Sequence, residues 1–337
     1  MKALLHYGAT GTNGLRLEEV EAKHPGPGEV RVRIKAAGLN HRDLFVLARR
    51  TGSEPPFIPG SDGAGIVEAV GSGVDHVRIG DEVIINPTLG WRYASEVPEV
   101  PDILGSPTDG TFAQSTVVPA INIEPKPAYL SWEEAGVLPL AALTAYRALF
   151  TRGQVKQGEH VLLPGIGSGV ATYALAMAKA AGAEVTVTSR DAGKRNKAME
   201  LGADAAIDSQ GDWGEALEGR KVDLIVESIG PATFPQYFKV LRPGGRIVSL
   251  GATSGDTVEI PLRPFLFPQF SFLGTSMGSA EEFKQMLQFV DKHRIRPVLD
   301  ETFPLAEAVR AFQRMEEGRQ FGKIALIPEE EVYHATV

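Results

Sequence analysis

A run of small residues is the feature of this sequence with the clearest chemical use. The segment GIGSGVA, residues 165–171, follows the apolar stretch 160–163 and precedes an alanine-rich stretch of helical composition. Glycines let the backbone approach a ligand closely, and the free N–H groups at a helix start attract anions. The alternative is a tight strand–helix turn without a ligand. We expect a dinucleotide pyrophosphate to lie against Gly165, Gly167, Ser168, Gly169 and Val170.

Polar and basic residues follow the next apolar strand. NAD sites place an acidic residue there for the ribose diol, whereas NADP sites offer cations to the 2′-phosphate. Here the strand ends in Ser189 and Arg190, and Lys194 comes one helical turn later. A hydroxyl, a guanidinium and an ammonium suit a phosphate dianion, so we predict NADPH as the cofactor. Asp191 is interpreted as a helix N-cap, and the alternative for the two cations is an ordinary solvated surface.

Further small residues stand at the ends of two later apolar strands. Ser228 and Gly230 follow the stretch VDLIVE, and Gly251 follows GGRIVSL. Ligands of open α/β sheets bind at the carboxyl ends of the strands. We therefore add these three residues to the predicted cofactor site.

Composition excludes several classes of function. The chain has 337 residues, 43% of them hydrophobic, a net charge of −8 and no cysteine. An acidic chain is a poor partner for nucleic acid or an anionic membrane, and no apolar run reaches the ~20 residues that span a bilayer. Without cysteines or closely paired histidines we expect no metal site. The N-terminus lacks the apolar core of a signal peptide, so we expect a cytoplasmic protein.

The pattern of elements changes along the chain. Residues 29–40 alternate apolar and charged residues, as in a half-buried strand, and the first ~125 residues read as β-rich. Residues 86–111 are dense in Pro, Gly, Ser and Asp and predict a long loop or lobe. Beyond residue 131, apolar strands alternate with helical stretches. This alternation predicts a parallel sheet covered by helices on both faces.

Many spaced motifs resemble the medium-chain dehydrogenase/reductase superfamily. The resemblance implies an α/β protein with a split GroES-like β-rich domain, residues 1–124 and 294–337. It implies a Rossmann domain with a doubly wound parallel sheet over residues 125–293. The motifs are GLNHRD (38–43), PGSDGAG (59–65), VRIGDEV (77–83), DGTFA (109–113), TAY (144–146), the glycine run, and LRPGGR (241–246).

Three replacements distinguish this chain from the zinc-dependent branch of the superfamily. That branch carries Cys where Asn40 stands and His-Glu where Ser61 and Asp62 stand. The sequence is instead similar to the zinc-free quinone oxidoreductase branch, which includes zeta-crystallin-like proteins and enone reductases. One departure is Phe45, because some of those reductases carry a tyrosine at this position. The usual aromatic hydroxyl is therefore absent.

The resemblance implies hydride transfer from NADPH to a quinone or an enone without a metal ion. We expect Asn40 to donate a hydrogen bond near the nicotinamide or the acceptor oxygen, with a turn-capping role as the alternative. His41 and Thr144 are further catalytic candidates, against structural roles for both. By resemblance Ser276 and Gly278 flank the nicotinamide. Alternative functions are an alcohol or aldehyde dehydrogenase and a non-catalytic NADPH-binding protein.

The assembly expected from the resemblance is a homodimer, or a homotetramer. The segment FLFPQFSFLG, residues 265–274, is apolar and aromatic, and the resemblance implies that it holds an edge strand that pairs with its copy. An uncovered apolar edge would promote aggregation. The cysteine-free lobe at 86–108 resembles the segment that holds a structural zinc in the zinc branch, and its own role is not predicted.

Overall fold

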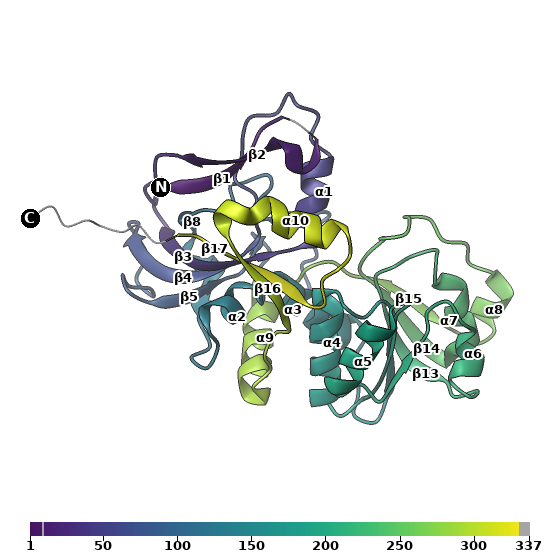
Figure 1. The fold of residues 1–337 in the computed structure, drawn as a ribbon. Coiled ribbons are helices and arrows are strands. Elements are labelled where there is room, and N and C mark those ends of the chain that lie inside the picture. Colours follow the sequence, from purple (N-terminus) through teal and green to yellow (C-terminus); the bar gives the residue numbers. More distant parts are fainter. Residues whose placement is uncertain (9, 330–337) are drawn as a thin grey trace, which may run out of the picture. The chain divides into compact units, whose positions relative to one another are not determined.

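The computed structural model describes residues 1–8 and 10–329, and it divides into two compact units (Figure 1). The first unit contains Met1–Leu140, Ser279–Lys284 and the described residues from Leu299 onward. The second contains Ala141–Gly278 and Gln285–Val298. The first unit is thus split in sequence. Its first part extends to residue 140, beyond the expected end at 124, because α2 (Trp132–Gly136) lies against β3 (Glu29–Leu39). Any side chain on Gly136 would meet the carbonyl oxygen of Ala36 at 2.5 Å.

The first unit is built on a mostly antiparallel sheet. Strand β3 carries the predicted alternation, since Val30, Val32 and Ile34 are buried and Arg33 is exposed. β8 (Ser115–Pro119) also pairs with β3. The strands run in the order β16 (Leu299–Pro304), β17 (Lys323–Ile327), β3 (Glu29–Leu39), β4 (Asp62–Val70), β5 (Glu82–Ile85) and β9 (Ile123–Pro125).

The pairing of β17 with β3 sets up the candidate site. Ile324 lies opposite Leu39 in antiparallel register, so Lys323 is at the end of β3 where helix α1 (His41–Ala48) begins. β3 also pairs with β4, and Gly38 lies opposite Asp62. Residues far apart in the chain therefore meet where β3 ends.

Other elements complete the core and surface of this unit. Leu47 of α1 and Phe312 of α10 (Ala308–Glu316) are buried with Leu39 and Phe112 in the same core cluster. The smaller elements are β1 (Lys2–His6), η1 (Gly11–Gly14), β2 (Leu15–Glu19), η2 (Ala120–Asn122), η4 (Leu305–Glu307) and α10 (Ala308–Glu316).

The predicted lobe is present in the first unit. It contains the paired strands β6 (Thr88–Leu89) and β7 (Asp102–Ile103). The carbonyl groups of Trp91 and Arg92 accept hydrogen bonds from the backbone N–H groups of Ala280 and Glu281, at 2.8 and 3.0 Å. The lobe thereby satisfies N–H groups that the start of α9 (Ala280–His293) leaves without helical partners.

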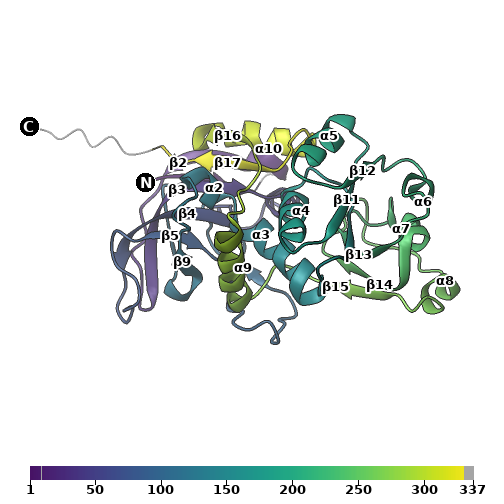
Figure 2. The same ribbon diagram turned by 90° about the horizontal axis from the view of Figure 1, so that it is seen from below.

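The second unit is a parallel sheet with helices on both faces (Figures 1 and 2), which confirms the predicted Rossmann architecture. Helices α4 (Gly169–Ala180) and α5 (Ala192–Glu200) lie on one side, and α6 (Trp213–Ala216) and α7 (Phe234–Val240) on the other. The short helix α8 (Leu262–Leu266) precedes the edge strand. The strand order is β12 (Ala205–Ile207), β11 (Glu184–Thr188), β10 (His160–Leu163), β13 (Val222–Glu227), β14 (Leu241–Ser249) and β15 (Ser271–Gly274).

The helical stretch after Ser131 is divided into three pieces. A capping box begins the first piece, because Ser131 Oγ accepts from the Glu134 backbone N–H while the Glu134 carboxylate accepts from that of Ser131. Helix α2 then ends at Gly136, and Pro139 opens helix α3 (Pro139–Tyr146), which continues as the π-helical segment η3 (Arg147–Arg152). Proline lacks the N–H that would continue the earlier helix. No helix in residues 1–8 and 10–329 is long and apolar enough to cross a membrane.

Candidate active site

A buried polar cluster surrounds the side chain of Lys323. Its ammonium donates to the Leu39 carbonyl at 3.0 Å, to Asn40 Oδ1 at 2.5 Å and to Asp62 Oδ2 at 3.0 Å. The Lys323 and Asp62 side chains are only 3% and 0% exposed. A buried charge is costly without a partner, and this close pairing offsets that cost for both groups.

The hydrogen bonds fix the orientation of the Asn40 side chain. Its amide oxygen faces the Lys323 ammonium, and Nδ2 donates to Asp62 Oδ2 at 2.9 Å. The second contact of Nδ2, to the Gly38 carbonyl, is long at 3.4 Å. One amide hydrogen is therefore firmly bound and the other only weakly held. Asn40 is also the N-cap position of α1, as the structural alternative expected.

Asp62 connects this cluster to helix α3. Its second oxygen, Oδ1, accepts a 2.7 Å hydrogen bond from the backbone N–H of Leu140 in the first turn of that helix. Such N–H groups have no helical partner, and a carboxylate satisfies them well. The Asp62 side chain is therefore bonded by the N-cap residue of α1, by β17 and by α3 at once.

Asp43 is a second buried carboxyl group in this region. It accepts a 2.8 Å hydrogen bond from the backbone N–H of Asn40 and thereby caps α1. Burial raises the pKa of Asp43 to about 7, and the hydrogen bond from Asn40 and the charge of Arg42 only partly oppose this. The rise indicates a carboxyl group that is partly protonated near neutral pH.

Arg42 ties the lobe to the same region. Its guanidinium donates to Ser61 Oγ and to the Ser106 carbonyl, at 2.9 and 2.8 Å, and reaches the Leu104 carbonyl at 3.3 Å. Burial lowers the pKa of Arg42. Sequence reasoning gave Arg42 no role, although an arginine inside the motif GLNHRD is a visible signal.

The residues at the zinc-branch positions do not fit a zinc ion. Zinc in proteins takes thiolate, imidazole and carboxylate ligands. Asn40 supplies only an amide, the Ser61 hydroxyl is bonded to Arg42, and the Asp62 carboxylate is neutralised by Lys323. No three His, Cys, Asp or Glu side chains within the described ranges converge to share a metal ion.

His41 lies at the edge of the cluster, at the start of α1. Its ring nitrogen Nε2 is 3.5 Å from Nε2 of Gln320, and His41 is half-buried. The Gln320 side-chain oxygen is buried without a hydrogen-bond partner among the described residues. These polar groups suit contact with a ligand, and Gln320 was not singled out from the sequence.

The glycine run of the second unit has the backbone of a phosphate-binding turn. Gly165 and Gly167 have φ values of 73° and 121°, which side chains rarely adopt. Ile166 N donates to the Thr188 carbonyl at 2.9 Å and so ties the turn to the end of β11. Ser168 is the N-cap of α4, and its Oγ accepts from Ala171 N. Gly169 and Val170 begin the helix, whose first N–H groups suit a pyrophosphate.

The end of β11 carries the predicted cationic groups. Asp191 caps α5 as expected, since its carboxylate accepts from Lys194 N at 2.9 Å. Ser189 Oγ accepts from Asp191 N. Arg190 is exposed and makes no hydrogen bond or ion pair with the described residues. A further cation, Arg195, donates to the Ser189 carbonyl at 2.6 Å. The Asp191 carboxylate is thus engaged by the helix start, while the Arg190 guanidinium extends into solvent.

Glu227 builds the turn that carries Ser228 and Gly230. One of its carboxylate oxygens accepts from the backbone N–H groups of Ile229 and Gly230, and the other is buried without a partner among described residues. Burial raises the pKa of Glu227 to about 7. Any side chain on Gly251 would meet the Ser228 carbonyl at 2.9 Å, so the two turns lie against each other. Glu227 was not predicted from the sequence, although a carboxyl group at the end of an apolar strand could have indicated it.

The segment after β15 shows a similar close approach. Thr275 Oγ1 is buried without a hydrogen-bond partner within the described part of the chain, and Ser276 is exposed. A Cβ at Gly278 would meet the Leu143 side chain at 2.6 Å, which brings this segment beside α3. Thr144, in that helix, is 6% exposed. An orphaned hydroxyl and glycine-lined turns are features that fit a bound dinucleotide.

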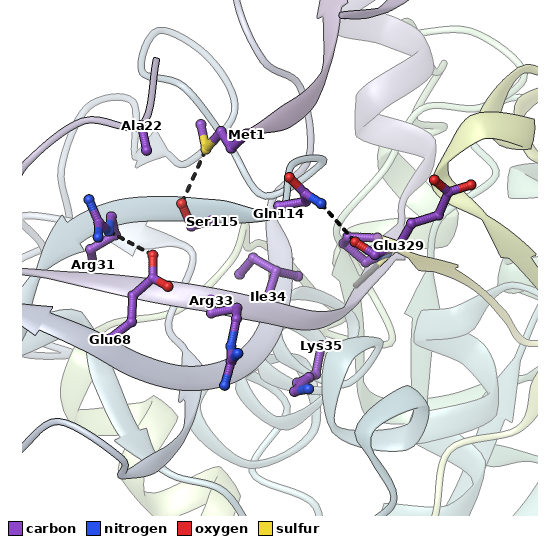
Figure 3. A pocket seen from close by; sticks show the side chains of 11 residues that line it. Met1, Ala22, Arg31, Arg33, Ile34, Lys35, Glu68, Gln114, Ser115 and Glu329 are labelled. Atoms are coloured by element: carbon purple, nitrogen blue, oxygen red, sulfur yellow. Dashed lines mark hydrogen bonds and ion pairs between the residues drawn. The ribbon is translucent and has the colours of Figure 1, made fainter. Parts of the chain in front are cut away.

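A cavity of about 260 Å³ lies beside β3 in the first unit (Figure 3) and contains none of the predicted site residues. Several of the polar groups that line it form an ion pair or a hydrogen bond with one another. Arg31 pairs with Glu68 at 2.6 Å, and Gln114 donates to the Glu329 carbonyl at 2.8 Å. We therefore do not assign the chemistry to this cavity.

Comparisons with known proteins agree with this geometry. The family described as "Alcohol dehydrogenase GroES-like domain" matches residues 26–128, and "Zinc-binding dehydrogenase" matches residues 169–292. A zinc-type alcohol dehydrogenase-like protein of Schizosaccharomyces pombe is 35% identical over 97% of this chain and 99% of its own length. The chain belongs to the medium-chain dehydrogenase/reductase superfamily. The superfamily predicted from the motifs is thereby confirmed.

Two further relatives of this medium-chain dehydrogenase/reductase bear on its chemistry. The crotonyl-CoA carboxylase/reductase of Cereibacter sphaeroides is 30% identical, over 89% of this chain and 80% of its own length. A solved NAD-dependent alcohol dehydrogenase is 35% identical with a TM-score of 0.90, covering 97% of this chain and 99% of its own. This member of the superfamily is accordingly an oxidoreductase that uses a nicotinamide cofactor.

Proposed function

We propose that this oxidoreductase transfers hydride from NADPH to quinones or activated alkenes without a metal ion. The observation that carries the proposal is the 3.0 Å ion pair between the buried Lys323 ammonium and Asp62. A cation is already bound to the one carboxylate at the zinc-branch positions. A second, divalent cation at the same oxygen would meet strong repulsion in a buried environment.

Quinones and enones suit a site with this composition. When bound, the nicotinamide supplies the hydride. The charge that develops on a conjugated acceptor spreads to its oxygen, where hydrogen-bond donors stabilise it. The weakly held amide hydrogen of Asn40 is the donor that we propose for this oxygen. His41 is the proposed source of the proton, and the hydroxyl of Thr144 is proposed to contact the nicotinamide.

The NADPH preference is supported by the groups at the end of β11. Asp191 uses its carboxylate to cap α5, so it does not offer the usual partner for a ribose diol. We propose that Ser189, Arg190 and Lys194 bind the 2′-phosphate. The remaining cofactor contacts proposed are Gly165, Gly167, Ser168, Gly169, Val170, Ser228, Gly230, Gly251, Ser276 and Gly278.

The relatives favour two substrate classes. Crotonyl-CoA is an α,β-unsaturated thioester, and its reductase among the relatives supports an activated alkene. The alcohol dehydrogenase names support oxidation of an alcohol as the second candidate. In the zinc branch a metal ion serves that reaction as a Lewis acid. A non-catalytic NADPH-binding protein is the third candidate.

An acceptor panel tests the proposed function. Quinones, enones and α,β-unsaturated thioesters would be mixed with NADPH and enzyme, and nicotinamide absorbance followed. A second panel of primary alcohols with NADP⁺ would test for alcohol oxidation under the same conditions. Metal content would be measured on the same preparation. We expect turnover with at least one conjugated acceptor and no stoichiometric zinc. Turnover with alcohols alone, together with one zinc per chain, would contradict the proposal.

We further propose that two copies associate through the second unit. β15 is the last strand of its sheet, and Phe272 on it is 39% exposed. Leu262 and Phe267 just before it are 71% and 74% exposed. Large exposed apolar patches commonly mark interfaces, and this one favours pairing of β15 with its symmetry copy.

A further inference from the structure

Lys323 is an unusual residue for its position. It begins the strand KIALI, in which Ile324, Ala325 and Leu326 are fully buried, and its own side chain is 3% exposed. Lysines are rarely buried unless they are paired. Three oxygen atoms lie at 2.5–3.0 Å from its nitrogen, which matches the three hydrogens of an ammonium group. The environment is therefore built for a charged lysine.

We propose that Lys323 is a positioning residue for hydride transfer: its ammonium is the fixed internal cation that sets which way the Asn40 amide faces. This inference rests on the function proposed above, because it assigns the reason that Asn40 can serve as a donor. Lys323 itself has no hydrogen left for a substrate, so it acts through its neighbours.

The direction of the Asn40 amide follows from the chemistry of the ammonium group. An ammonium only donates hydrogen bonds, so it bonds to the amide oxygen of Asn40 and repels the amide NH₂ group. Rotating the amide by 180° would place donors against donors. The Nδ2 hydrogens must then face Asp62 Oδ2 and the weak acceptor at the Gly38 carbonyl. Lys323 thereby keeps the Nδ2 hydrogens of Asn40 on the side of the amide that faces away from the ammonium group.

Asp62 completes the arrangement on the other side. Its Oδ2 is shared by Lys323 and Asn40, at 3.0 and 2.9 Å, and its Oδ1 is held by Leu140 N. The carboxylate cannot turn toward solvent without losing all three bonds. A cation held in place by the fold needs no reorganisation during the reaction, which is the property that favours electrostatic catalysis. Asn40 is therefore pre-set by two buried charges.

The test is a double-mutant cycle on the two charges. Lys323→Met and Asp62→Asn would be made singly and together, with Lys126→Met as the matched control. Lys126 is also buried, with 6% of its side chain exposed, but its partner Glu82 is 56% exposed. Each single change at Lys323 or Asp62 leaves one charge unpaired, and we expect its thermal midpoint to fall by about 10 °C. We expect the double variant to recover most of that loss, and the control to stay near wild type.

Turnover of the stable double variant decides the positioning role. We expect its kcat to fall at least about 10-fold because the Asn40 amide is no longer oriented. We expect its KM for NADPH to stay within about two-fold of wild type, because Lys323 contacts no proposed cofactor residue. Lys323→Ala supplemented with propylammonium should regain part of the lost kcat.

Three results would overturn the inference. Full wild-type kcat in the double variant would reduce the pair to a structural role. Equal loss of kcat and NADPH affinity would indicate general damage. Additive losses of thermal midpoint in the cycle would show that the charges are not coupled. Failure of the proposed function is distinguishable, because the wild type itself would then reduce no acceptor, and the cycle would still decide whether Lys323 orders this centre.

Discussion

Arg42 donates a 2.9 Å hydrogen bond to Ser61 Oγ while its guanidinium also reaches carbonyl groups of the lobe. A side chain of α1 therefore contributes to the attachment of the lobe. We expect Arg42→Met to lower the free energy of unfolding by about 2–4 kcal/mol, because lobe carbonyls lose a charged donor. Ser61→Ala should cost only about 1 kcal/mol. Urea denaturation measures both, and limited proteolysis should cut residues 86–108 faster in Arg42→Met. Equal proteolysis of the two variants would contradict the attachment role.

Glu227 predicts a pH dependence of stability. Its pKa is raised from 4.5 to about 7 in the folded protein, so the folded state keeps a proton that the unfolded state loses near pH 4.5. The contribution of Glu227 to stability is therefore full below about pH 4.5 and is lost as pH rises through 7. Glu227→Gln keeps the acceptor for the turn and cannot ionise. We expect it to be more stable than wild type at pH 8, by at most about 3 kcal/mol, and similar at pH 5.

Urea midpoints at the two pH values test this prediction, and Asp43 supplies an internal comparison. Its pKa is also raised to about 7, so Glu227→Gln should flatten only part of the decline between pH 5 and pH 8. If the wild type instead gained stability between pH 5 and pH 8, the raised pKa values of Glu227 and Asp43 would be contradicted.

Arg190 should control the choice of cofactor. Its exposed guanidinium is the proposed partner of the 2′-phosphate, and losing such a pair weakens binding by roughly 10- to 100-fold. We expect Arg190→Gln to raise the dissociation constant for NADPH by that factor and to leave NADH unchanged. Arg220→Gln is the control, because Arg220 pairs with Glu184 at the opposite end of β11. Fluorescence titration gives both constants. An unchanged NADPH constant would remove Arg190 from the phosphate site.

The edge strand β15 should set the oligomeric state. Phe272→Lys places a charge on the exposed edge, where pairing with a second copy would bury it. We expect analytical ultracentrifugation to show a shift from dimer to monomer. Val100→Lys is a suitable control, because Val100 is 77% exposed in the lobe of the first unit. A wild type that sediments as a monomer would contradict the proposed association directly.

Local patterns predicted the architecture well because they act over short distances. The glycine run and the alternation in β3 each depend on neighbouring residues. Lys323 was not predicted, because its partners lie 261 to 284 residues away and nothing local requires a charge in that strand. Glu227 and Arg42 were missed for a related reason, since their roles depend on burial. Pro139 was visible, yet the break it makes between α2 and α3 was not predicted.

The position of β17 in the chain has a consequence for biosynthesis. Lys323 leaves the ribosome 261 residues after Asp62, when the whole second unit has already been translated. Domains generally fold as units during synthesis, so the Rossmann sheet is able to form while the Asp62 carboxylate still lacks its cation. Until β17 adds to β3, that carboxylate is more stable in water than in the core. The first sheet is therefore completed only after the second unit has been synthesised. Asn40 becomes ordered at that late step, when β17 brings Lys323 to Asp62.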